Sequence, residues 1–126
     1  VVYGESLGGA VAARLAAERT VKGLVIECSF SSIRDMAKKY YPWVPGWFVR
    51  NRFDTLSAAR RAECPNPLLA SADDDIVPYV LSQKLFAAAR EPKRFVEMRG
   101  SHNTAFLDSF PLWSAGLENF LSSLAE

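Results

Sequence analysis

The sequence lacks a strong excess of charge of either sign, a long apolar run and a recognisable leader. Fifteen Lys and Arg residues and fourteen Asp and Glu residues leave a formal net charge of +1. Because no long run of one sign occurs, the charge pattern offers no electrostatic case for binding nucleic acid or an anionic membrane surface. The apolar runs are far shorter than a bilayer requires. The chain starts inside an element, so an upstream signal or anchor, and with it membrane association, stays open.

Cysteine and histidine are also scarce. The two cysteines, Cys28 and Cys64, lack the spacing of metal ligands, and we expect them to be reduced and packed rather than joined in a disulfide. Unpaired cysteines make the cytoplasm the default location. The remaining composition is that of a globular domain, with 49% hydrophobic and 23% charged residues. Neither a metal nor an organic cofactor is implied.

Short β-rich runs alternate with helical stretches along the chain, which favours a parallel sheet flanked by helices. The run at residues 23–27 is almost continuously apolar, as buried parallel strands tend to be. An N-cap at Ser31-Ser32 and a stop before Pro42 bound one of the helices. We expect strands at residues 1–3, 23–27, 66–70 and 93–98, and helices at residues 9–19, 33–41, 78–90 and 110–124.

A longer segment, residues 30–64, separates the second and third expected strands and is dense in aromatic residues. Two interpretations of it stay open. One is a small packed excursion, with its rings buried against the domain; the other is a lid whose apolar underside accepts an acyl chain, and the two are compatible. The rings concerned are Phe30, Tyr40, Tyr41, Trp43, Trp47, Phe48 and Phe53.

The stretch Gly4-Glu5-Ser6-Leu7-Gly8 has the pattern G-x-S-x-G and lies between an expected strand and an expected helix, the context of a nucleophile elbow. The serine would occupy a strained turn that lifts its hydroxyl clear of the sheet. Glycines on either side would let the strand and the helix approach without side-chain clashes. The amide of Leu7, at the start of the helix, would donate to a developing oxyanion.

A serine nucleophile needs a base, and the chain contains one histidine, His102, in a loop after the fourth expected strand. The base in turn needs an acid that holds its imidazole in the right tautomer. The loop after the third strand offers Asp73, Asp74 and Asp75, although these could also form a solvated acidic loop that caps the next helix. Glu27, at the end of the second strand, is a further alternative.

Five stretches carry a resemblance to a known family: YGESLGGAVA, ECSFSSIRDMA, YYPWVPGWFVRNRFDTL, CPNPLLASADDDIVP and RGSHN. Together they resemble the α/β-hydrolase superfamily, and within it the small α/β-hydrolase-domain serine hydrolases that include protein depalmitoylases and many bacterial members. The chain order serine, aspartate, histidine is also that of the superfamily. The resemblance implies the C-terminal half of an α/β-hydrolase fold, a partial domain over residues 1–126 with parallel strands five to eight and flanking helices.

The resemblance also selects among the candidate acids. In such proteins the acid loop usually reads G-x-x-D-x-hydrophobic-V-P, and alignment on Val77-Pro78 puts the aspartate at Asp74. Ser71 then stands where the family has glycine, a departure that is tolerated if its φ stays negative. The resemblance pairs Ser6, Asp74 and His102 as nucleophile, orienting acid and general base.

The function implied by this resemblance is hydrolysis of acyl esters, thioesters or amides through an acyl-enzyme, on a small-molecule or acyl-group substrate. Strands one to four and the loop with the second oxyanion donor would lie outside these residues, so we expect a fragment of a longer gene product. Residues 1–3 would then form a bare apolar edge. The alternatives are a non-catalytic fragment or binding module, and a serine peptidase of the prolyl-oligopeptidase type. The oligomeric state stays open.

Overall fold

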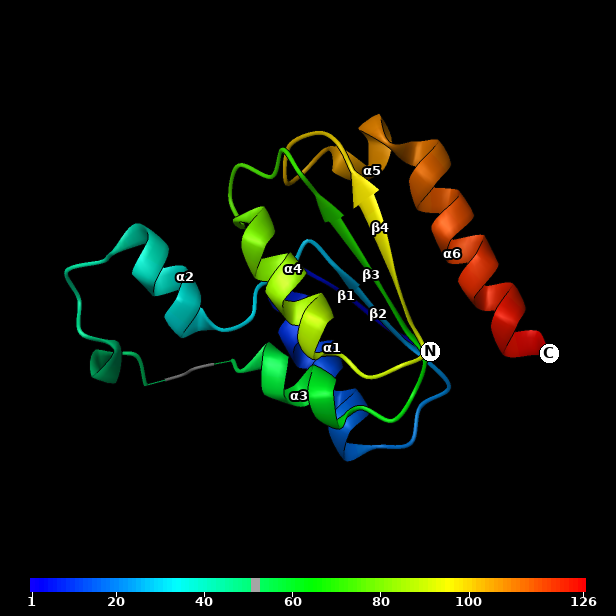
Figure 1. Cartoon of the computed structure of the whole chain (residues 1–126), viewed down its shortest axis with the longest axis horizontal. Helices are drawn as coiled ribbons and strands as arrows, with labels where there is room; N and C mark the ends of the chain where they lie inside the picture. Colours follow the sequence, from blue (N-terminus) through cyan, green and yellow to red (C-terminus); the bar gives the residue numbers. More distant parts are fainter. Residues whose placement is uncertain (51–52) are drawn as a thin grey trace.

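The computed structural model describes residues 1–50 and 53–126, which form a four-stranded sheet with every neighbouring pair of strands parallel. The strands lie side by side in chain order (Figure 1): β1 (Val2–Glu5), β2 (Leu24–Glu27), β3 (Asn66–Ser71) and β4 (Lys93–Met98). This confirms the predicted parallel sheet. Since all four strands run the same way, the loops that follow them gather at one edge of the sheet.

Four helices lie where the sequence predicts them: α1 (Leu7–Glu18), α2 (Ile33–Tyr40), α4 (Tyr79–Ala88) and α6 (Phe110–Ala125). Three short helices were not predicted: η1 (Gly46–Phe48), α3 (Thr55–Arg61) and α5 (Ala105–Asp108). The only local signal for α3 is its N-cap, where the side chain of Asp54 accepts a hydrogen bond of 3.1 Å from the N–H of Ser57. Within the described ranges, none of the helices is both long and apolar enough to cross a membrane.

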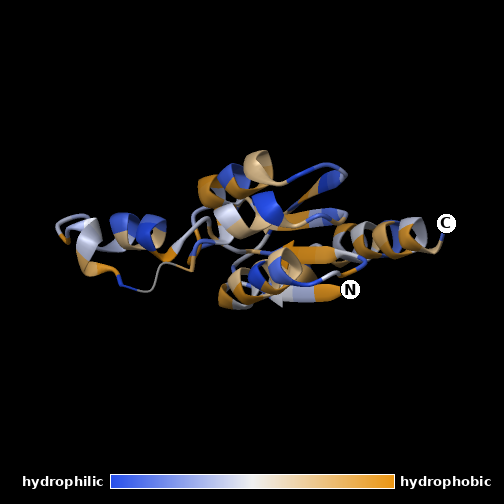
Figure 2. Ribbon diagram, turned by 90° about the horizontal axis from the view of Figure 1, so that it is seen from below, coloured by the Kyte–Doolittle hydropathy of each residue, from blue (hydrophilic) through white to orange (hydrophobic). Residues whose placement is uncertain are grey.

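The alternation of side chains along the strands decides which helix each residue meets. Leu24 and Ile26 of β2 pack in a cluster with residues of α1, α3 and α4 on one face of the sheet. Val25 points to the opposite face and packs with Phe120 of α6. Because both faces are covered, β2 and β3 are buried along their whole length, which explains their nearly continuous apolar sequences. Figure 2 shows the apolar strands between these helical layers.

The predicted excursion at residues 30–64 divides into two parts, and residues 51 and 52 of it lie outside the described residues. The later part contains α3, whose buried Ala58 and Ala59 belong to the core cluster of the body. The earlier part, residues 33–50, is called the arm here; it comprises α2, η1 and their connections and projects away from the sheet (Figure 1). Among the aromatic side chains of the excursion, Phe30 and Phe53 pack in a core cluster. The rings of the arm are exposed instead: Tyr40, Tyr41, Trp43, Trp47 and Phe48. The interpretation with all rings buried is therefore wrong for the arm, and the lid stays a prediction.

The elbow joins β1 to α1 through Ser6, whose φ of 53° and ψ of −120° are the strained conformation that the motif predicts. A side chain at Gly4 would overlap the backbone of Gly8, so the predicted close approach of strand and helix holds there. The prediction is wrong for Gly8, because an added Cβ would meet nothing within 4 Å. The second glycine without room for a side chain is Gly9, which packs against the side chain of Ser29.

This difference gives a matched pair of variants. We expect Gly4→Ala to lower the free energy of unfolding by about 1–3 kcal/mol or more, since the new methyl group meets backbone that has no room to move. Gly8→Ala should be neutral or stabilising by up to about 1 kcal/mol, because alanine favours the helix over glycine. Chemical denaturation of both variants measures the two effects. Equal destabilisation by both substitutions would contradict this account of the elbow.

Candidate active site

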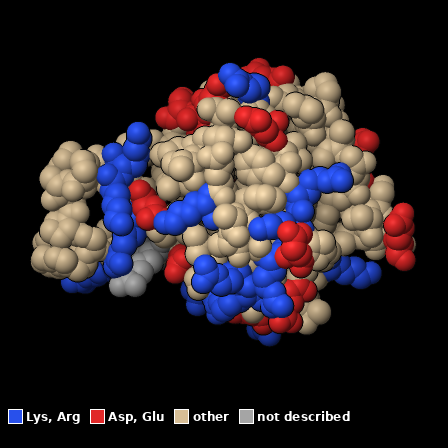
Figure 3. Space-filling model, in the orientation of Figure 1, with Lys and Arg blue, Asp and Glu red and all other residues tan. Residues whose placement is uncertain are grey.

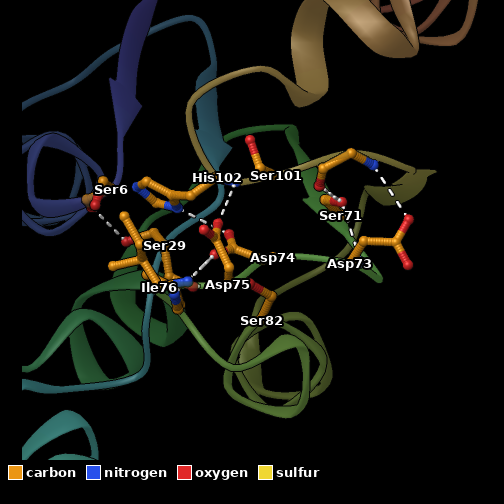
Figure 4. A network of polar contacts seen from close by, with 12 residues as sticks. Ser6, Ser29, Ser71, Asp73, Asp74, Asp75, Ile76, Ser82, Ser101 and His102 are labelled. Atoms are coloured by element: carbon orange, nitrogen blue, oxygen red, sulfur yellow. Dashed lines mark hydrogen bonds and ion pairs between the residues drawn. The ribbon is translucent and has the colours of Figure 1, made fainter.

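The three residues implied as nucleophile, acid and base come from loops that follow three different strands. Ser6 follows β1, Asp74 follows β3 and His102 follows β4. The parallel sheet brings these loops together at the carboxyl ends of its strands, where α/β folds bind their ligands. Figure 4 shows the His102 ring lying between the carboxylate of Asp74 and Ser6.

His102 and Asp74 form a buried pair. Nδ1 of His102 lies 2.8 Å from Oδ2 of Asp74, and the two side chains are only 6% and 3% exposed. The other carboxylate oxygen, Oδ1, accepts hydrogen bonds from the N–H groups of Ile76 (2.9 Å) and Val77 (2.8 Å). These two bonds fix the carboxylate, and the carboxylate fixes the plane of the imidazole ring. Its second ring nitrogen is thereby directed toward the elbow.

The neighbouring carboxylates of the acid loop bind backbone instead of the imidazole. Oδ1 of Asp75 accepts a bond of 2.9 Å from the N–H of His102, and this bond lowers the pKa of the Asp75 carboxyl. Oδ2 of Asp73 accepts a bond of 3.2 Å from the N–H of Gly100 and lies 2.8 Å from Nε of Arg99. Each of the three aspartates therefore has a separate partner, and Asp74 is the one that contacts the ring.

Ser71 joins the acid loop to residues 99–104, the loop that carries His102 and is called the base loop here. Sequence reasoning missed this contact. Its buried hydroxyl donates to the carbonyl of Gly100 (2.5 Å) and accepts from the N–H of Asp73 (3.2 Å). Ser71 does not have a positive φ, so the departure from the family's glycine is accommodated as expected. The only signal in the sequence is the hydroxyl itself, at a position where the family carries no side chain.

Ser6 presents its side chain at the edge of the sheet. Its hydroxyl makes no capping bond to α1, while its N–H donates to the carbonyl of Glu27 (2.9 Å) and its carbonyl accepts from Oγ of Ser29 (2.7 Å). No hydrogen bond links the side chains of Ser6 and His102 among the contacts of the described residues, although they face each other in Figure 4. Leu7 is the first residue of α1, so its N–H has no partner within the helix.

Glu27, the alternative acid, is paired elsewhere. Its buried carboxylate accepts a hydrogen bond of 3.1 Å from Nε1 of Trp113 on α6. Burial raises the pKa of Glu27, while the bond from Trp113 and the nearby His102 act in the opposite direction. The structure therefore separates the roles of the two buried carboxyl groups, Glu27 with Trp113 and Asp74 with His102. Nothing in the sequence pointed to Trp113.

Cys28 lies close to the pair, with its sulfur within 4.8 Å of the ligand atoms of Asp74 and His102. Burial, with the nearby Asp74 carboxylate adding to it, raises the pKa of the Cys28 thiol to about 12. The facing atoms of Asp74 and His102 are already hydrogen-bonded to each other. These donors suit proton transfer better than coordination of a metal. Cys64 is also buried and free, as predicted.

No family model matches the chain, whereas curated proteins do. The chain is 35% identical over 125 residues to the uncharacterized protein Rv2307c of Mycobacterium tuberculosis, a match that covers 98% of this chain and 44% of that protein. It is 33% identical over 147 residues to the alpha/beta hydrolase domain-containing protein WAV2 of Arabidopsis thaliana, which covers 99% of this chain and 47% of that protein. The chain thus spans less than half the length of these curated relatives.

Solved structures agree on the architecture. The esterase domain of a Rhodothermus marinus protein matches with a TM-score of 0.69 at 24% identity, over 91% of this chain and 57% of that chain. At this identity the likeness shows the fold alone. Together with the parallel sheet, the elbow after β1 and the named relative, it shows that the chain belongs to the α/β-hydrolase superfamily.

Proposed function

We propose that this chain carries the nucleophile, base and acid of a serine hydrolase that cleaves acyl esters, thioesters or amides. One observation carries the proposal: the buried His102–Asp74 pair, with 2.8 Å between Nδ1 and Oδ2, whose ring faces Ser6 on the elbow. A carboxylate on Nδ1 keeps that nitrogen protonated, which leaves Nε2 as the acceptor for a proton. Membership of a superfamily rich in hydrolases supports the same reaction class.

The first half of the proposed reaction forms the acyl-enzyme. His102 takes the proton of the Ser6 hydroxyl as its Oγ attacks the acyl carbonyl carbon, and the carbonyl oxygen becomes an oxyanion. The N–H of Leu7 would donate to this oxyanion, with a second donor supplied from outside these residues. As the tetrahedral intermediate collapses, His102 returns its proton to the departing alcohol, thiol or amine. Asp74 stabilises the imidazolium throughout.

The second half repeats the same steps with water. His102 takes a proton from a water molecule whose oxygen attacks the acyl carbon of the ester on Ser6. The bond between that carbon and Oγ then breaks, and His102 returns the proton to Ser6. The product is a carboxylic acid, and the enzyme regains its starting state. No step of the proposed reaction requires a cofactor.

A serine-directed fluorophosphonate probe tests the assignment. We expect the probe to label Ser6 and Ser6→Ala to abolish labelling. Asp74→Asn should slow labelling and ester hydrolysis by about 10³–10⁴-fold, because the ring loses the partner that sets its tautomer. Asp73→Asn is the matched control; its exposed carboxylate binds Arg99 and the backbone, so we expect less than about a tenfold change.

The measurement should use both the 126-residue chain and the longest gene product that contains it, with circular dichroism as the check on folding. A folded longest product that the probe does not label would contradict the hydrolase and favour the binding module. Labelling that survives Ser6→Ala would contradict the choice of nucleophile. A peptidase of the prolyl-oligopeptidase type would be labelled too but would prefer peptide over ester substrates.

Cys28 is the competing nucleophile beside His102, and its protonation decides against it. With a thiol pKa of about 12, almost no thiolate exists near pH 8, and its fraction grows only as the pH approaches that value. We therefore expect iodoacetamide at pH 8 to leave the native enzyme active and Cys28 unmodified, as mass spectrometry of the peptides would show. Denatured protein provides the control, in which both cysteines should react. Rapid inactivation of the native enzyme would overturn this expectation.

A further inference from the structure

The arm exposes large aromatic side chains that a folded protein normally buries. Trp43 and Trp47 are each 74% exposed, and Tyr41 and Phe48 are also mainly exposed. The rings contact one another in pairs: Trp47 stacks on Phe48 with centroids 4.1 Å apart, and Tyr41 meets Trp43 edge-on at 5.8 Å. The arm projects from the body in both ribbon views (Figures 1 and 2), so these four exposed rings, called the knob here, lie on a segment that stands clear of the sheet.

The same arm concentrates positive charge. Between Ile33 and Arg50 the sequence has four basic residues and one acidic residue, whereas the whole chain has a net charge of +1. The basic residues are Arg34, Lys38, Lys39 and Arg50. The single carboxylate, Asp35, is already held by Lys84 of α4 at 2.9 Å and by the hydroxyl of Ser31. Figure 3 shows basic side chains lying between the uncharged knob and the body. The balanced charge of the whole chain conceals this local excess.

The arm is fastened to the part of the body that carries the site. The hydroxyl of Tyr40 donates to the carbonyl of Ile76, whose own N–H binds Asp74 at 2.9 Å. At the base of the arm, the N–H of Leu56 donates to the carbonyl of Ser31 at 3.0 Å. A surface that holds the knob would therefore hold the carboxyl edge of the sheet at a fixed distance from it.

We propose that the arm docks this protein on an anionic lipid bilayer, with the four rings in the interface and the basic side chains on the headgroups. Tryptophan and tyrosine favour this boundary because each has an apolar ring and one polar atom. Cations beside an apolar face add attraction to anionic lipids. A protein partner fits less well, since lysine is depleted at protein interfaces and Lys38 and Lys39 directly precede Tyr40 and Tyr41 in the sequence of the arm. The proposal does not depend on the hydrolase activity.

Vesicle binding tests it, with the longest gene product carrying Ser6→Ala so that no lipid is consumed. The vesicles are phosphatidylcholine alone or with about 30 mol% phosphatidylglycerol, and binding is measured by co-sedimentation. We expect binding to the anionic vesicles that weakens with salt. Lys38→Gln with Lys39→Gln should weaken it by about 30-fold, since each basic residue near the surface contributes about a factor of five. Trp43→Ala with Trp47→Ala should reduce it at least as much.

Leu107→Ala with Leu121→Ala is the matched control, because these exposed leucines lie on α5 and α6, away from the arm. Phosphatidylcholine brominated on its acyl chains adds a local readout. It should quench the fluorescence of Trp43 and Trp47, and this quenching should be absent from the variant Trp43→Ala with Trp47→Ala. Absence of binding would overturn the proposal, as would binding that both arm double variants leave unchanged. The proposal would also be overturned if the protein formed dimers that Trp43→Ala with Trp47→Ala converts to monomers and the lysine variant does not. The knob would then be the contact surface for a second copy of the chain.

Discussion

The turn out of the sheet at the ends of β1 and β2 is the constraint on which the site depends. Glu5 and Glu27 are register partners, and the residue after each, Ser6 and Cys28, has a positive φ, 53° and 46°. Each such conformation costs on the order of 1–3 kcal/mol for a residue with a side chain. Hydrogen bonds offset the cost: the N–H of Ser6 donates to Glu27, and that of Cys28 donates to Leu69. Both strained residues lie beside the imidazole of His102: Ser6 faces the ring, and the sulfur of Cys28 is within 4.8 Å of its ligand atom.

The base loop is held in place by contacts that have no chemical role of their own. The acid loop binds it through three side chains: Ser71 and Asp73 on Gly100, and Asp75 on the N–H of His102. The ring contact of Asp74 is therefore one of several links between the same two loops. The proposed mechanism needs the base to be held within about 0.5 Å of its working position, and redundant links of this kind would provide that order.

The sequence predicts the features that repeat or that need a special residue. The apolar run of β2, the glycine pattern at Ser6 and the chain order of the candidate residues all depend on local chemistry that is visible in one dimension. The features that the sequence did not predict are short elements or contacts between residues far apart in the chain. α3 is seven residues long, and the contact between Trp113 and Glu27 joins residues 86 positions apart. Which rings of the arm are exposed depends on where the chain turns, which composition does not specify.

Hydrogen bonding separates the two buried carboxyl groups that lie near His102. Asp74 accepts two backbone N–H bonds on one oxygen and faces the ring with the other. Glu27 has a single donor, Trp113, and burial raises its pKa. Glu27 is thus paired with the indole of Trp113, whereas Asp74 is paired with the imidazole of His102. The carboxylate that contacts His102 is therefore the one held on both of its oxygens, as the proposed base needs if its protonated form is to be stabilised.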